Sequence, residues 1–106
     1  MEFTGNIFAN IPKNSEQELF EDLFKNDFIK IERIISYGNS SDENFWYDQS
    51  HSEWVLIIQG SATLQFEAHE LFEMKKGDYI FIPPHKKHRV DSTDLNKPTI
   101  WLAIHY

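Results

Sequence analysis

The most telling part of this chain is Tyr47-Asp48-Gln49-Ser50-His51-Ser52-Glu53-Trp54-Val55-Leu56-Ile57-Ile58-Gln59-Gly60. From Glu53 onward it reads as a strand, with odd-numbered residues on one face and even-numbered residues on the other. Both faces are apolar, whereas a strand with water on one side would carry polar residues there. We therefore expect the second face, formed by residues 54 to 58, to be covered by the N-terminal segment or by another subunit, and we predict a homodimer.

Other short runs rich in β-branched and aromatic residues lie on both sides, separated by clusters of Gly, Pro, Asn, Asp or Ser. Strands are predicted over residues 28–37, 44–49, 53–59, 61–67, 70–74, 79–82, 88–92 and 98–105. Many short strands with frequent turns indicate a sandwich or barrel. Closing the sheet also removes the edges that so small a domain would otherwise expose. The predicted fold is all-β, a small antiparallel β-barrel of the jelly-roll type.

A short helix is expected ahead of the barrel. Ser15 and Glu18 have the spacing of a capping box, in which each side chain satisfies a free backbone amide. Apolar residues then recur at helical spacing, at Leu19, Phe20, Leu23 and Phe24. We predict a single domain over residues 1–106, with an N-terminal segment and helix over 1–27 and the barrel over 28–106.

Composition excludes several classes of protein. The chain has 106 residues, which is the size of one domain, and it has no cysteine, so it forms neither disulfides nor thiolate metal sites. Seventeen acidic and ten basic residues give a formal charge of -7, which disfavours binding to nucleic acid. The N-terminus lacks a leader pattern and the apolar runs are too short to span a membrane, so we expect a cytoplasmic protein.

Two spaced motifs resemble those of the cupin superfamily, in particular its small single-domain barrels. Glu53 is followed by six residues and then Gly60, as in the first motif. Downstream, Gly77, Pro83 and His88 stand at the positions of the second motif. The chain differs from these motifs at positions that often bind metal or take part in catalysis in that family. Where the first motif commonly has His-x-His this chain has Tyr47-Asp48-Gln49, and His85 and Ser92 replace the usual Gly and Asn.

The resemblance implies a divalent metal held inside the barrel by Gln49, Glu53 and His88, with His51 as a further candidate ligand. The ion would be manganese, iron, nickel or zinc, and the oxygen-rich donor set shifts the preference toward harder ions such as manganese. By analogy the protein would be a dioxygenase, isomerase or decarboxylase acting on a small polar molecule, with Tyr47 and His85 transferring protons. The alternative is a non-catalytic, metal-free module that binds or senses a small ligand, which the missing His-x-His favours.

Each candidate also has a purely structural interpretation. Glu53 and His88 could form a buried ion pair, because a buried carboxylate needs a partner. His51 could be an exposed loop residue, and His105 on the last strand is better explained as a structural histidine. Four aromatic side chains could line a ligand pocket or could simply fill the core, namely Trp46, Phe66, Phe81 and Trp101.

Overall fold

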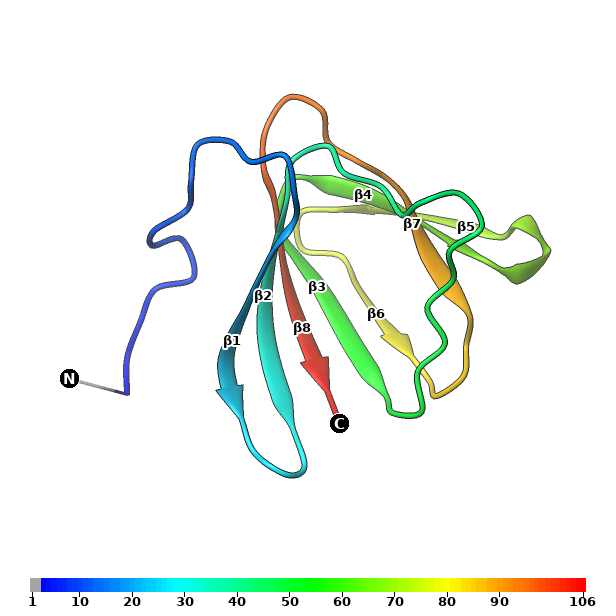
Figure 1. Cartoon of the computed structure of the whole chain (residues 1–106), viewed down its shortest axis with the longest axis horizontal. Helices are drawn as coiled ribbons and strands as arrows, with labels where there is room; N and C mark the ends of the chain where they lie inside the picture. Colours follow the sequence, from blue (N-terminus) through cyan, green and yellow to red (C-terminus); the bar gives the residue numbers. More distant parts are fainter. Residues whose placement is uncertain (1–2) are drawn as a thin grey trace.

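Two antiparallel sheets form the body of the protein in the computed structural model, which describes residues 3–106 (Figure 1). The five-stranded sheet has the order β1 (Leu19–Lys25), β2 (Lys30–Ser36), β8 (Thr99–His105), β3 (Glu53–Gln59) and β6 (Tyr79–Ile82). The three-stranded sheet has the order β5 (Leu71–Lys75), β4 (Ser61–Phe66) and β7 (His88–Thr93). A short 3-10 turn, Glu67–His69, links β4 to β5. The predicted all-β fold is confirmed.

The predicted strands agree closely with the observed ones, except for residues 44–49. That stretch contains no strand, and only Tyr47 forms an isolated antiparallel bridge, which pairs it with His88. Asn44 has φ +70°, a left-handed conformation that interrupts an extended chain. The segment is therefore a loop that is fixed to β7 at one point.

The predicted N-terminal helix is wrong. The residues after Glu18 form β1, which pairs with β2 at the edge of the larger sheet, so the sheet begins at Leu19. The Ser15 hydroxyl bonds to the backbone of Gln17 in a local turn instead of capping a helix. A bulge between Asp22 and Phe24 adds one residue to β1. Pairing with β2 thus overrides a helical spacing of apolar residues that is only two turns long.

The core lies between the sheets and follows the alternation predicted for β3. Val55 and Ile57 point inward and are buried, and they pack with residues from both sheets, including Leu64, Phe66, Met74, Ile82 and Trp101. Gly60 joins β3 to β4 with φ +86°. A Cβ atom there would lie 2.8 Å from the Thr99 Cα, so this position requires glycine.

The outer face of the larger sheet is apolar across β8, β3 and β6, whereas Arg33 on β2 forms an ion pair with Glu21 on β1. Its central pairs are Trp54 with Ile104 and Leu56 with Leu102, all of which are partly exposed. On β6, at the edge of the same face, Tyr79 is 63% exposed and lies opposite Leu56.

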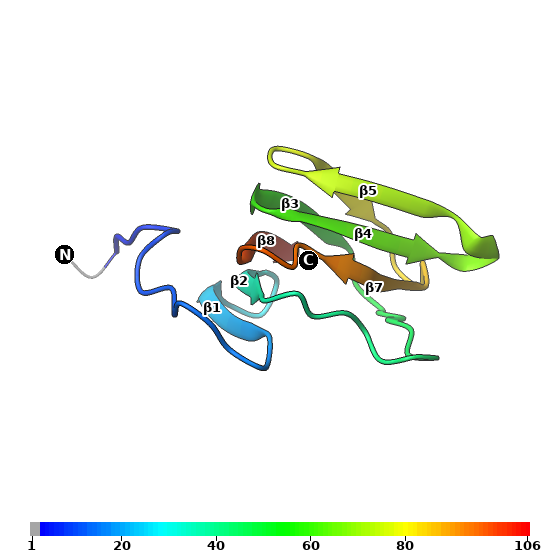
Figure 2. The same ribbon diagram turned by 90° about the horizontal axis from the view of Figure 1, so that it is seen from above.

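The N-terminal arm, defined here as residues 3–12, leaves the body of the protein beyond β1 (Figure 2). It is anchored through Arg33, whose Nη1 donates hydrogen bonds to the carbonyl oxygens of Ile7 and Ala9. Phe3 and Phe8 in the arm are 89% and 52% exposed. Within residues 3–106, no helix is long and apolar enough to cross a membrane.

Candidate functional site

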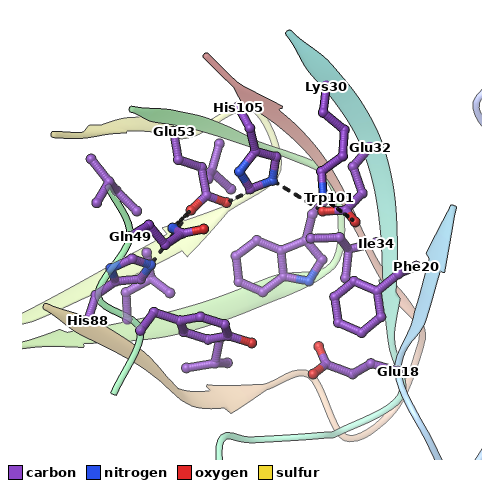
Figure 3. Close-up of a pocket in the computed structure, with 15 residues that line it drawn as sticks. Glu18, Phe20, Lys30, Glu32, Ile34, Gln49, Glu53, His88, Trp101 and His105 are labelled. Carbon is purple, nitrogen blue, oxygen red and sulfur yellow. Dashed lines mark hydrogen bonds and ion pairs between the residues drawn. The ribbon is translucent and has the colours of Figure 1, made fainter. Parts of the chain in front are cut away.

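A cavity of about 240 Å³ lies between the two sheets (Figure 3). Its polar lining comes from β2, β3, β7, β8 and two loops, and consists of Glu18, Lys30, Glu32, Tyr47, Gln49, Glu53, His88 and His105. The remaining lining residues are apolar or aromatic, namely Phe20, Ile34, Val55, Leu64, Ile82, Val90 and Trp101. Phe20, the lining residue on the edge strand β1, is 57% exposed.

The strand register explains why the polar groups meet. β8 lies between β2 and β3, and His105 is paired with Lys30 on one side and with Glu53 on the other. Residues paired in this way lie on the same face of the sheet. Glu32 is two residues farther along β2 than Lys30, so it lies on this inner face as well.

Glu53 is at the centre of the polar group. Its side chain is largely buried, and it accepts a hydrogen bond of 2.8 Å from Gln49 Nε2 to Oε1. The Nε2 atoms of His88 and His105 lie 3.7 Å from Oε1 and 3.8 Å from Oε2, respectively. Burial by itself would raise the pKa of Glu53, but the interactions with His88, Gln49 and His105 outweigh it and lower the pKa below its ordinary value. Glu53 is therefore an ionised carboxylate with a largely buried side chain.

His105 continues the network away from Glu53. Its Nε2 lies 3.2 Å from Glu32 Oε1, and its Nδ1 lies 2.9 Å from His51 Nε2. A carboxylate accepts hydrogen bonds, so Nε2 of His105 is the donor to Glu32. His51 therefore reaches the site only through His105. Glu32 and His105 were missed as site residues because the β2–β8 pairing that joins them cannot be seen in the sequence.

His88 and Tyr47 form a second wall. Their rings stack with centroids 5.3 Å apart, and the backbone bridge between them holds the loop against β7. His88 Nδ1 donates to the carbonyl oxygen of Lys86 over 2.8 Å, and this bond turns Nε2 toward Glu53. Burial raises the pKa of Tyr47, and the charges of nearby carboxylates raise it further, so the phenol keeps its proton.

Other predicted site residues lie elsewhere. The side chain of His85 is 69% exposed, and its Nδ1 is 2.8 Å from Asp48 Oδ1, so it does not line the cavity. Among the four predicted pocket aromatics, Trp101 lines the cavity. Phe66 is buried in the core beside His88, and Phe81 is half exposed on β6. Trp46 lines a separate hollow with His69 and Lys87.

The donor groups do not fit a divalent cation. Because an ionised carboxylate only accepts hydrogen bonds, Gln49 must turn its NH₂ group toward Glu53 and its oxygen, the atom that could bind a metal, away from that carboxylate. The imidazoles of His88 and His105 lie beside different oxygens of Glu53. In the part of the chain that the structure describes, no group of three or more His, Cys, Asp or Glu side chains is arranged to hold a metal ion.

Comparisons with known proteins agree with this architecture. Residues 35–105 match a family model described as a cupin domain. A crystal structure from Ralstonia eutropha, described as a proposed mannose-6-phosphate isomerase, is 43% identical, with a TM-score of 0.93 over 96% of this chain and 95% of that one. A search of curated proteins gave no match.

More distant structures share the fold. A cupin superfamily protein from Desulfitobacterium hafniense is 22% identical, with a TM-score of 0.75 over 90% of this chain and 82% of that one. The polyketide cyclase RemF from Streptomyces resistomycificus is 17% identical, with a TM-score of 0.72 over 85% of this chain and 65% of that one.

Proposed function

This chain belongs to the cupin family, and we propose that it binds a small organic molecule in its internal cavity without the help of a divalent metal ion. The observation that carries the proposal is the 2.8 Å hydrogen bond from Gln49 to Glu53. It gives the carboxylate a neutral partner inside the protein. Glu53 can then act as a fixed polar anchor for a ligand, because its charge is already stabilised in the absence of an ion.

The cavity has the composition of a small-molecule site. Ligand pockets are mostly apolar, with a few polar groups that orient the ligand. Here Trp101, Ile34 and Leu64 provide apolar walls, while Glu53 and His88 stand at one end. The volume of about 240 Å³ suits a molecule of metabolite size. Glu53 is held ionised by its neighbours, which supports binding of a ligand more than proton abstraction by this group.

A metal-dependent isomerase is the second candidate. It is favoured by the 43% identity to the Ralstonia eutropha protein that is described as a proposed mannose-6-phosphate isomerase. The cavity of this chain is poorly suited to a sugar phosphate, since Lys30 is the one lysine or arginine that lines it within the described residues, and Lys30 already lies 3.6 Å from Glu32. The two candidates differ in whether metal binding accompanies ligand binding.

We further propose that the protein is a homodimer joined through the outer face of the larger sheet. Trp54, Leu56 and Leu102 form a continuous apolar surface, and exposed surfaces of this kind mark sites of protein association. The same patch on a second copy would cover it by twofold symmetry. The projecting N-terminal arm, with its exposed Phe3 and Phe8, would then pack on the partner.

A thermal-shift screen of small polar molecules tests the proposed binding function. The screen is run on untagged protein in chelator, so that no metal ion contributes. A ligand that raises the melting temperature in chelator supports metal-free binding, since a ligand stabilises the state it binds. Ligands that act only after metal is restored would contradict it.

A further inference from the structure

The charge of the cavity narrows the class of ligand. Among residues 3–106, three carboxylates line it, those of Glu18, Glu32 and Glu53, but only one lysine, Lys30. Lys30 lies at the rim, where its side chain is 35% exposed, and its Nζ is 3.6 Å from Glu32 Oε2. The lysine therefore offsets Glu32, and the imidazoles of His88 and His105 lie beside Glu53, which leaves Glu18 without a cationic partner among these groups. Those rings carry charge only when protonated.

Glu18 is the carboxylate best placed to meet a ligand. Its Oε2 accepts a 2.6 Å hydrogen bond from the hydroxyl of Ser36, which is fully buried. Ser36 in turn accepts a 2.9 Å hydrogen bond from Nε1 of Trp101. Ser36 and Trp101 are both neutral, so these hydrogen bonds fix the position of the Glu18 carboxylate without cancelling its charge. Such a preorganised carboxylate loses little entropy when it binds a cation.

An aromatic surface lies between the acidic groups. Figure 3 shows the indole of Trp101 between Glu18 on one side and the Glu53–His105 pair on the other. The face of a tryptophan ring attracts cations. Burial raises the pKa of Tyr47, and Glu18, Glu53 and Glu32 raise it further. The negative potential of these carboxylates, which disfavours a phenolate at Tyr47, favours a positively charged group in the same cavity.

We propose that the cavity selects a small organic cation, whose ammonium group is attracted by the Glu18 carboxylate and by the aromatic surface of Trp101. This inference rests on the proposed function, because it names the class of molecule that the metal-free cavity takes. The hydrocarbon part of the ligand would pack on Ile34 and Leu64. An anionic ligand of the same shape would lose affinity through repulsion by the buried carboxylates.

Three probes of nearly equal shape isolate the effect of charge. The cation is choline, the neutral probe is 3,3-dimethylbutan-1-ol and the anion is 3,3-dimethylbutanoate. Each has a compact group with three methyls. We expect calorimetric titration in chelator at neutral pH and low salt to show choline binding at least tenfold more tightly than the neutral alcohol, with no binding of the carboxylate. Tighter binding of the alcohol or the carboxylate, or no binding of choline at millimolar concentration, would overturn the inference.

A variant assigns the effect to Glu18. Glu18→Gln keeps an oxygen that can accept from Ser36 but removes the charge, so choline affinity should fall about tenfold, while binding of the neutral alcohol stays the same. Glu43→Gln, on an exposed loop away from the cavity, removes the same charge from the protein and should leave choline binding unchanged. Equal loss in both variants would mean that only net charge matters, and it would overturn the role of Glu18.

These measurements distinguish failure of the cation inference from failure of metal-free binding. Binding of the neutral or the anionic probe in chelator, without binding of choline, overturns the cation inference but leaves metal-free binding intact. Binding of any probe that appears only after a metal ion is added contradicts the proposed function itself.

Discussion

Gln49 and Glu53 lie four residues apart and are joined by a hydrogen bond of 2.8 Å, in which the amide nitrogen of Gln49 donates to the carboxylate of Glu53. Gln49 lies in the loop before β3, and Glu53 is the first residue of that strand. A neutral amide therefore partners a buried charge near His88. Together with His88 and His105, this amide keeps Glu53 ionised in a site that does not fit a divalent cation.

The first prediction concerns acid stability. The pKa of Glu53 in the folded protein lies below its ordinary value of 4.5, so the unfolded state takes up the proton first as the pH falls. The stabilisation by ionised Glu53 is fully present above the ordinary pKa and is lost as the pH falls through the lower, folded-state pKa. Urea denaturation at a series of pH values should show wild type losing stability relative to Glu53→Gln across this acid range. A stability difference that does not change with pH would contradict the lowered pKa.

The second prediction compares His85 and His88, which lie three positions apart in the sequence but differ in burial. The side chain of His88 is 6% exposed and contacts Glu53, whereas that of His85 is 69% exposed. His88→Ala leaves a buried carboxylate with fewer partners, so the free energy of unfolding should fall by about 3 kcal/mol. His85→Ala should change it by less than about 0.5 kcal/mol. Chemical denaturation measures the free energy of unfolding of both variants. A similar decrease in the two would contradict a stabilising role for the buried Glu53–His88 pair.

The third prediction tests the proposed dimer. Tyr79 on the outer face is 63% exposed, so Tyr79→Glu should leave the fold intact but place a charge in the proposed interface. Sedimentation analysis should find wild type as a dimer and this variant shifted toward monomer. Leu71→Glu, on the other sheet at a residue 57% exposed, is the matched control and should remain dimeric. A monomeric wild type would rule out the interface.

The sequence predicts this fold well because most of its strands alternate strongly and are bounded by turn residues. β3 illustrates this, with Val55 and Ile57 buried and Trp54 and Leu56 on the opposite face, as predicted. β1 was wrongly expected to be helical, because its pairing with β2 is a tertiary effect that local spacing of apolar residues does not reveal.

The candidate site could be predicted only in part. Glu53 and His88 stand at spaced motif positions, and the structure brings them together. Glu32 and His105 lie far apart in the chain and meet only through the register of β2 and β8. His85 follows two prolines that suggest a fixed direction, but its left-handed backbone with φ +63° presents the side chain to solvent and Asp48.

Metal content tests the central claim most directly. Untagged wild-type protein is loaded with manganese, iron, nickel or zinc, passed through a desalting column and assayed for bound metal. The double substitution Tyr47→His with Gln49→His serves as the positive control, because it supplies two imidazoles beside Glu53 and His88. We predict no stoichiometric metal in wild type and nearly one ion per chain in the double variant. Nearly one ion per wild-type chain, lost in His88→Ala, would contradict a metal-free cavity.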